Sequence, residues 1–320
     1  MAEQLAAAAA AALGPLLKAY WALAAGSVIA TLLPVPLPRA FKDAVTLAAC
    51  RGKLWHSKPD ALGPLRDWSV PQSWFLHFYL LGAACNAATL AAFACCGAAG
   101  AAAAAGGAAA GRAALALALF QFHLLRRAAE TAFIMRYPRD ARMHGIAYLF
   151  GLSYYAAVPL SLLPDGWLRS LPHALAAPTG AAACVDGWRA EAGELLKQGP
   201  AVAALAGTGA ATFLLGNALQ FASHLALARL AGDAQRRSEK TAYRIPRGAL
   251  FELVSCPHYL AEIIIYCGLA LAAGGSANTL LMLVWVSVNL VLAAGATQAW
   301  YRARFKTYPE KRRALVPYVY

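Results

Sequence analysis

Long apolar segments recur along the whole chain, and they decide in which solvent it can fold. A transmembrane helix needs about 20 predominantly apolar residues. Segments of about this length lie at residues 14–33, 74–96, 111–135, 144–163, 201–227, 258–274 and 277–299. The chain is 60% hydrophobic and 13% charged, whereas a soluble domain carries about 25% charged residues. We therefore predict an all-α, multi-pass integral membrane protein with about seven transmembrane helices.

Basic residues are biased to one side of this arrangement. If the seven segments are spans, 21 Lys and Arg residues lie in loops on one side and 4 on the other. The basic side holds the loops 34–73, 136–143 and 228–257 and the tail after residue 299. Because basic loops stay in the cytosol, we predict a cytosolic C-terminus and a luminal N-terminus. On the luminal side, a short amphipathic helix is expected at 188–196, within the Pro-containing loop 164–200.

Other features narrow the possible functions. The net charge of +13 follows from the one-sided loops, so no nucleic-acid partner is predicted. The seven cysteines form no paired framework or Cys-x-x-Cys motif, and we expect neither disulfides nor a metal site. No Gly-x-Gly-x-x-Gly or Walker pattern occurs, so a Rossmann or P-loop nucleotide site is not supported. The N-terminus has no basic stretch, so the first apolar segment is expected to remain as an anchor.

The segment 240–262, KTAYRIPRGALFELVSCPHYLAE, interleaves polar, aromatic and charged residues between two apolar segments. Pro246 turns the backbone, and a new helix is expected near Pro257. His258 and Glu262 then lie one turn apart on one face of that helix. A basic loop that leads into a membrane helix with His and Glu at its mouth suits an anion site. The alternative is a loop whose charges meet anionic lipid head groups.

Ionisable residues also occur inside the third span. His123, Arg127 and Glu130 follow one another at helical spacing and share a face. Such residues are costly in a bilayer and usually face a bundle interior or a wet cavity. The alternative is a structural Arg–Glu pair, with Arg126 reaching the membrane interface.

Two further groups remain ambiguous from spacing alone. Gln220 and His224 lie one turn apart near the cytosolic end of the fifth span, either as packed polar residues or as contacts of a cofactor. Tyr79 follows Trp74 and His77 at the start of the second span. These aromatic residues suit an interfacial belt or a site.

The C-terminal motifs resemble a known family. RIPRGALFELVS at 244–255, followed by HYLAE at 258–262, and FKTYPEKRRALVPYVY at 305–320 are similar to the signature and terminus of the steroid 5α-reductase family. VP at 70–71 with FLHFY at 75–79, together with the FELVS and PHYLAE variants, resembles the polyprenol-reductase branch. The resemblance implies one transmembrane reductase domain over 1–320, a cofactor-binding region at 240–320 and an endoplasmic reticulum membrane.

The same resemblance implies NADPH as the hydride donor. The cofactor contacts that it implies are Gln220, His224, Tyr243, Arg244, Arg247, His258, Glu262 and Tyr301. Arg244 and Arg247 would bind phosphates through their planar guanidinium groups. Steroid-reducing members carry Asn and Asp where Gln220 and His224 stand.

The reactive residues that the family implies lie in the second and third spans. Its His-x-x-x-Arg helix, with a following Glu, lines the cavity, which selects His123 and Glu130. Steroid-reducing members have a Tyr at the substrate carbonyl where this chain has Leu124. Another group must then polarise the carbonyl, either His123 or Tyr79.

The substrate implied is a long-chain polyisoprenoid in the bilayer. Reduction of the α-isoprene double bond of polyprenol or polyprenal would give dolichol or dolichal and feed dolichyl-phosphate synthesis for protein N-glycosylation. Hydride adds readily to the β-carbon of an enal because charge moves to the oxygen, so polyprenal is the expected immediate substrate. No obligate protein partner is predicted. The alternatives are a membrane methyltransferase of the isoprenylcysteine type, which uses S-adenosylmethionine, and a non-enzymatic scaffold or lipid-binding protein.

Overall fold

The computed structural model describes residues 2–49, 67–138, 141–169, 199–236 and 243–320, together with residues 54, 63, 65 and 193. Apart from residue 193, the short helix predicted at 188–196 lies outside the described residues. Residues 240–242 of the predicted cofactor-binding region also lie outside them.

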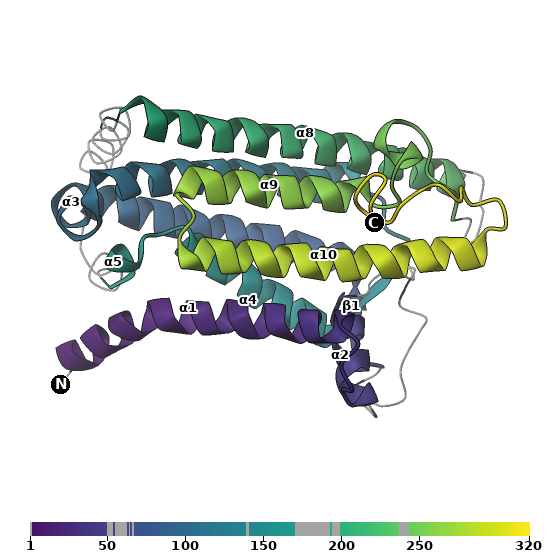
Figure 1. Cartoon of the computed structure of the whole chain (residues 1–320), viewed down its shortest axis with the longest axis horizontal. Coiled ribbons are helices and arrows are strands. Elements are labelled where there is room, and N and C mark those ends of the chain that lie inside the picture. Colours follow the sequence, from purple (N-terminus) through teal and green to yellow (C-terminus); the bar gives the residue numbers. More distant parts are fainter. Residues whose placement is uncertain are drawn as a thin grey trace.

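Within these residues, long helices run roughly parallel to the long axis of the molecule (Figure 1). They are α1 (Ala2–Leu32), α3 (Phe75–Ala129), α4 (Gly145–Ser161), α8 (Pro200–Arg236), α9 (Pro257–Ala273) and α10 (Ala277–Arg304). Shorter helical elements connect them: α2 (Arg39–Ala49), η3 (Gln72–Trp74), the π-helical turn η4 (Glu130–Ile134), α5 (Asp165–Leu168) and η5 (Ala249–Glu252). The N-terminus lies at one end of the long axis, and the loop 243–256 and the tail 305–320 lie toward the other end (Figure 1).

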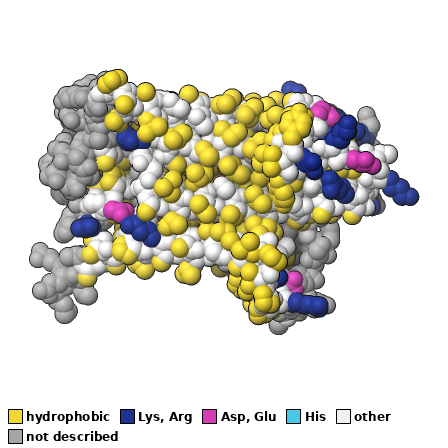
Figure 2. Space-filling view, in the orientation of Figure 1, with side chains coloured by type: hydrophobic (Ala, Val, Ile, Leu, Met, Phe, Trp, Pro, Cys, Tyr) yellow, Lys and Arg dark blue, Asp and Glu magenta, His cyan; other side chains and the backbone are white. Residues whose placement is uncertain are grey.

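The predicted multi-pass helical architecture is present in its coarse form. Among the described residues, four helical stretches are long and apolar enough to cross a membrane: Ala8–Leu32, Gln72–Phe93, Pro200–Asp233 and Ala277–Arg304. The helices α4 and α9 are apolar but shorter. Hydrophobic side chains cover the middle of the visible face, and charged ones lie toward its ends (Figure 2). The number of seven spans and the compartment of each terminus stay predictions.

Helix α3 folds back on itself. The amide of Asn86 donates to the carbonyl oxygen of Leu117 at 3.0 Å and to Oε1 of Gln121 at 2.8 Å. In a straight helix, 31 residues would separate Asn86 and Leu117 by about 46 Å. The chain therefore reverses between them, and its two limbs lie side by side, as expected for the segments predicted at 74–96 and 111–135.

Glycines bring α8 and α9 into close contact. A Cβ on Gly268 would lie 2.4 Å from the backbone nitrogen of Phe213, and one on Gly209 would lie 2.5 Å from that of Ala272. Small residues let membrane helices approach closely, where backbone packing replaces the hydrophobic effect. This contact sets the polar residues of α8 against those of α9.

Two short β pairings add to the helical bundle, and the prediction of an all-α fold did not include them. Strand β1 (Ser69–Pro71) pairs antiparallel with β2 (Arg142–His144). A single parallel bridge joins Val254 to Arg313. Each pairing is three residues long or shorter and joins segments that are distant in the sequence. Such short strands show no alternating hydrophobic pattern from which they could be predicted. The second one ties the tail to the loop that precedes α9.

Candidate active site

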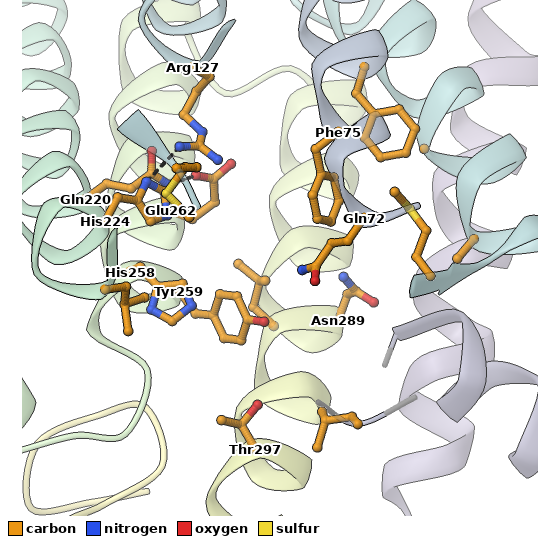
Figure 3. Close-up of a pocket in the computed structure, with 18 of the residues that line it drawn as sticks. Gln72, Phe75, Arg127, Gln220, His224, His258, Tyr259, Glu262, Asn289 and Thr297 are labelled. Carbon is orange, nitrogen blue, oxygen red and sulfur yellow. Dashed lines mark hydrogen bonds between the residues drawn. The ribbon is translucent and has the colours of Figure 1, made fainter. Parts of the chain in front are cut away.

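A cavity of about 530 Å³ opens between the helices. One side, which we call the polar wall, consists of Tyr79 and Arg127 from α3, Gln220 and His224 from α8, and Glu262 from α9. Apolar side chains from other helices also line the cavity, and we call them the apolar wall. This wall includes Val28 of α1, Val45 of α2, Phe150 of α4, and Trp285 and Val286 of α10. Figure 3 shows Arg127, Gln220, His224 and Glu262 gathered at one side of the cavity.

Arg127 is the centre of the polar wall. Its Nη2 donates to the hydroxyl oxygen of Tyr79 at 2.7 Å, and its Cζ lies 4.8 Å from the centre of that ring. Its Nη1 pairs with Oε2 of Glu130 and lies 2.6 Å from Nδ1 of His224. The same Nδ1 lies 2.9 Å from Oε2 of Glu130, so His224 contacts both the guanidinium of Arg127 and the carboxylate that it pairs with.

Arg126 connects the same carboxylate to α8. It pairs with Oε1 of Glu130, and its Nε donates to Oδ1 of Asn217 at 2.9 Å. Its Nη2 donates to Oε1 of Gln220, whose own amide nitrogen donates to Oε2 of Glu262. The alternative in which Arg126 reaches the interface is therefore wrong, because its side chain is 13% exposed and bonded within the bundle.

The cluster is charge-balanced as well as hydrogen-bonded. Two guanidinium groups, from Arg126 and Arg127, meet the carboxylate of Glu130 and, through Gln220, that of Glu262. Buried charges are tolerated when they are paired and their remaining hydrogen-bonding capacity is used. Glu130 reaches both arginines because it follows them at i+4 and i+3 along the helix, and the π-helical turn η4 begins at this residue. Such turns are frequent at functional sites.

His123 lies behind the polar wall rather than in it. Its ring is fully buried, stacked 6.0 Å from Phe120. Its Nδ1 lies 3.0 Å from Oδ1 of Asn217, whose amide nitrogen already donates to the carbonyl of Phe213. The same Nδ1 lies 3.3 Å from Nη2 of Arg126, so His123 contacts both Asn217 and Arg126 from behind the wall. Its Nε2 has no hydrogen-bond partner among the described residues and lies 3.9 Å from Oε1 of Glu262.

The loop before α9 lines the end of the cavity near the tail. Tyr243 and Arg244 of this loop line the cavity, together with His258 of α9 and Tyr301 of α10. The tail holds this loop in place, because the buried guanidinium of Arg312 donates to the carbonyl of Pro246 at 3.1 Å.

Arg247 belongs to the outer surface of the same loop. Its Nη1 lies 3.3 Å from Oε2 of Glu252, and the two side chains are 59% and 46% exposed. The pKa of the Glu252 carboxyl is lowered by the backbone N–H of Gly248, then by Arg247 and Arg312. Arg247 is not among the residues that line the cavity.

The structure brings most of the predicted site residues to one cavity. Eight line it: Tyr79, Gln220, His224, Tyr243, Arg244, His258, Glu262 and Tyr301. Glu130 and His123 contact the polar wall from behind, and Arg247 lies outside. The predicted roles of all of these residues stay predictions.

Sequence reasoning missed other residues of the cavity. Tyr259, Asn289 and Gln72 line it, and none was singled out. A signal existed for Asn289, which is an amide in the middle of an apolar span. None existed for Gln72, whose place depends on the pairing of β1 with β2.

Comparisons with known proteins point in one direction. Residues 196–320 match the family described as 3-oxo-5-alpha-steroid 4-dehydrogenase. Polyprenal reductase 1 of Arabidopsis thaliana is 33% identical, over 94% of this chain and 95% of its own length. Polyprenal reductase 1 of Oryza sativa subsp. indica is 30% identical, over 96% and 98%. The polyprenal reductase of Saccharomyces cerevisiae is 26% identical, over 84% of each chain.

Proposed function

The chain belongs to the steroid 5α-reductase family, with polyprenal reductases as full-length relatives, and from that premise we propose that it reduces the α-isoprene double bond of polyprenal. The product would be the saturated, dolichol-type lipid. The observation that carries this proposal is the cavity itself. Paired charges and apolar side chains line the same cavity, so a polar reductant and a hydrocarbon chain can meet there.

NADPH is the proposed reductant, and the donor set of the cavity suits it. Arg244 and the hydroxyl of Tyr243 lie at the end near the tail, where cationic and hydroxyl donors fit phosphate oxygens. The carboxylate of Glu262 lies in the polar wall, where it can accept from a carboxamide N–H. His258, Gln220, His224 and Tyr301 complete the proposed contacts. When bound, NADPH would supply the hydride, while the protein supplies orientation and electrostatics.

The substrate oxygen is proposed to bind Tyr79. Its phenol oxygen accepts from Arg127, so its own O–H remains to be donated to a carbonyl. The guanidinium of Arg127 holds the Tyr79 hydroxyl in place and adds positive charge near the oxygen on which negative charge develops. Between the two groups that the sequence left open, Tyr79 lines the cavity and His123 does not. Glu130 would act by orienting Arg127.

The aldehyde, rather than the alcohol, suits this arrangement. When a hydride adds to the β-carbon of an enal, the electrons of the double bond move toward the carbonyl oxygen. Tyr79 would stabilise that charge through its O–H, and a proton from water would add to the α-carbon, so that one hydride and one proton together saturate the double bond. An isolated allylic alcohol has no comparable electron sink, so we assign alcohol–aldehyde interconversion to another enzyme.

The proposed setting is the endoplasmic reticulum membrane, where the product would enter dolichyl-phosphate synthesis for N-glycosylation. Reductases as full-length relatives favour this proposal over a methyltransferase, which would use S-adenosylmethionine. They equally favour it over a non-enzymatic scaffold.

One experiment tests the reaction. Purified protein in lipid nanodiscs is incubated with NADPH and either polyprenal or polyprenol, and both lipids are followed by mass spectrometry. We expect polyprenal to gain two hydrogens as NADPH is consumed, and polyprenol to persist. Brisk saturation of polyprenol without any aldehyde would overturn the assignment of substrate. Binding of S-adenosylmethionine but not NADPH would overturn the reaction class.

A further inference from the structure

Two carboxamides on the far side of the cavity have no hydrogen-bond partner among the residues that the structure describes. Gln72 and Asn289 both line the cavity, and Figure 3 shows them across it from Arg127, Gln220 and Glu262. Neither side chain makes a hydrogen bond with another described residue, in contrast to Gln220, which bonds on both of its polar atoms. Their donors and acceptors therefore face the cavity.

Asn289 is unusual within its own helix. The two other amides of α10 are used: Asn278 donates to Oδ1 of Asp165 at 3.1 Å, and Gln298 donates to the carbonyl of Arg312 at 2.6 Å. The hydroxyls of Ser287 and Thr297 bond to carbonyls of the helix itself. Polar residues inside a span are costly and usually mark a path or site for a ligand. Asn289 is such a polar residue, and its side chain makes no hydrogen bond with a described residue.

Gln72 is held in place by the short sheet. Its backbone N–H donates to the carbonyl of Ala141 at 2.9 Å, which continues the β1–β2 pairing by one residue. Because β1 leads directly into η3, the pairing fixes the point at which the Gln72 side chain enters the cavity. The short β1–β2 sheet thus positions the Gln72 carboxamide at the cavity.

The surroundings of the two amides restrict what they can bind. Phe75, close to Gln72 in Figure 3, and Val286 and Leu290, near Asn289 in the sequence of α10, also line the cavity, so an occupant there is largely hydrocarbon. A pure hydrocarbon would leave both amides desolvated and unpaired, which is unfavourable. An isoprenoid that ends in an aldehyde or a hydroxyl offers an oxygen that two amide N–H groups can share.

We propose that Gln72 and Asn289 form the docking site for the oxygenated end of the isoprenoid, which they select before Tyr79 acts on it. This inference rests on the proposed function and adds to it a site of specificity. A site built to hydrogen-bond an oxygen strongly rejects an analogue that lacks it. The selection would therefore be for the head group and independent of the length of the hydrocarbon tail.

The test compares Gln72→Met, Asn289→Leu and the double variant with Ser287→Ala, a control on the same helix whose hydroxyl donates to the carbonyl of Leu283. Steady-state rates with polyprenal give KM and kcat. We expect each single variant to raise KM by about 3- to 10-fold, as for one lost neutral hydrogen bond, with kcat changed less than about twofold. The KM of Ser287→Ala for polyprenal should equal that of wild type. The KM for NADPH should be unchanged in every variant.

A binding experiment tests this inference separately from the proposed reaction, because binding can be measured without catalytic turnover. Displacement of a photo-crosslinkable polyprenol by unlabelled polyprenol or by squalene, an isoprenoid hydrocarbon without oxygen, is measured in nanodiscs. Wild type should prefer polyprenol by at least tenfold, and the double variant should lose that preference. Equal displacement by squalene in wild type, an unchanged KM in the double variant, or a raised KM for NADPH would overturn the proposal. Asn289→Ser, which keeps a polar group, should recover part of the affinity if the variants fold normally.

Discussion

The buried charge cluster and the basic loop before α9 contain the same kinds of ions in opposite environments. Arg126 and Arg127 are 13% and 9% exposed, and Glu130 between them is 1% exposed. Arg247 and Glu252 pair at 3.3 Å with 59% and 46% exposure. Water and salt compete for the second pair and scarcely for the first. The cluster thus builds a rigid wall, whereas the loop keeps charges that can respond to an arriving anion.

The largest effect is expected from the centre of the cluster. Glu130→Ala leaves two guanidinium groups buried without their shared carboxylate. Removing one partner from a buried ion network costs roughly 3–5 kcal/mol. We therefore expect rapid thermal inactivation in detergent, and loss of activity even where folded protein remains. Glu252→Ala on the loop is the matched control, and similar losses in both variants would remove the distinction between the two regions.

The next largest effect is expected at Tyr79, the proposed donor to the substrate oxygen. Tyr79→Phe removes the donor to the substrate oxygen but keeps the ring against Arg127. Loss of one oxyanion donor lowers kcat by about 100- to 1,000-fold, with little change in KM for polyprenal. His123→Gln, behind the wall, should cost less. A Tyr79→Phe enzyme with normal kcat would show that Tyr79 is not the donor to the substrate oxygen and would favour His123.

A moderate effect is expected from the two arginines of the loop before α9. Arg244 lines the cavity and Arg247 does not, although the sequence suggested both as phosphate contacts. Arg244→Ala should raise the KM for NADPH by about tenfold, as for a lost charge-assisted hydrogen bond, and weaken its dependence on salt. Arg247→Ala should raise it by less than about threefold. Equal effects would show that Arg247 turns inward when the cofactor binds.

The smallest effect is expected from the loop carboxyl. The folded-state pKa of Glu252 is lowered, chiefly by the N–H of Gly248, so its ionised form stabilises the fold above the ordinary Glu pKa of about 4.3. That contribution is lost as pH falls through the lower, folded-state pKa. Thermal inactivation of wild type and Glu252→Gln should differ slightly at neutral pH and converge in acid. A difference that grows in acid would contradict this sign.

Several features of the site follow from local spacing. One-turn separations placed His258 with Glu262 and Gln220 with His224 on shared faces, and all four line the cavity. A helix repeats its faces every three to four residues, so such pairs can be identified without tertiary information. The resemblance of the C-terminal motifs identified the family for the same reason, because those motifs are contiguous.

Other features depend on which helices meet. The sequence offered Arg126 as an interfacial residue, yet it bonds to Asn217 and Gln220 of α8, which lie about ninety positions further along the chain. No spacing rule connects residues so far apart. The same holds for Gln72, which reaches the cavity only because β1 pairs with β2.

By itself, the sequence determined that this chain is a helical membrane protein of the steroid 5α-reductase family, because apolar length, composition and contiguous motifs are local properties. Only the tertiary structure decided which polar residues share one cavity, which arginine lines it, and which amides find no partner among the described residues. Those outcomes depend on contacts between distant helices, where close glycine packing and the balance of buried charge select the partners.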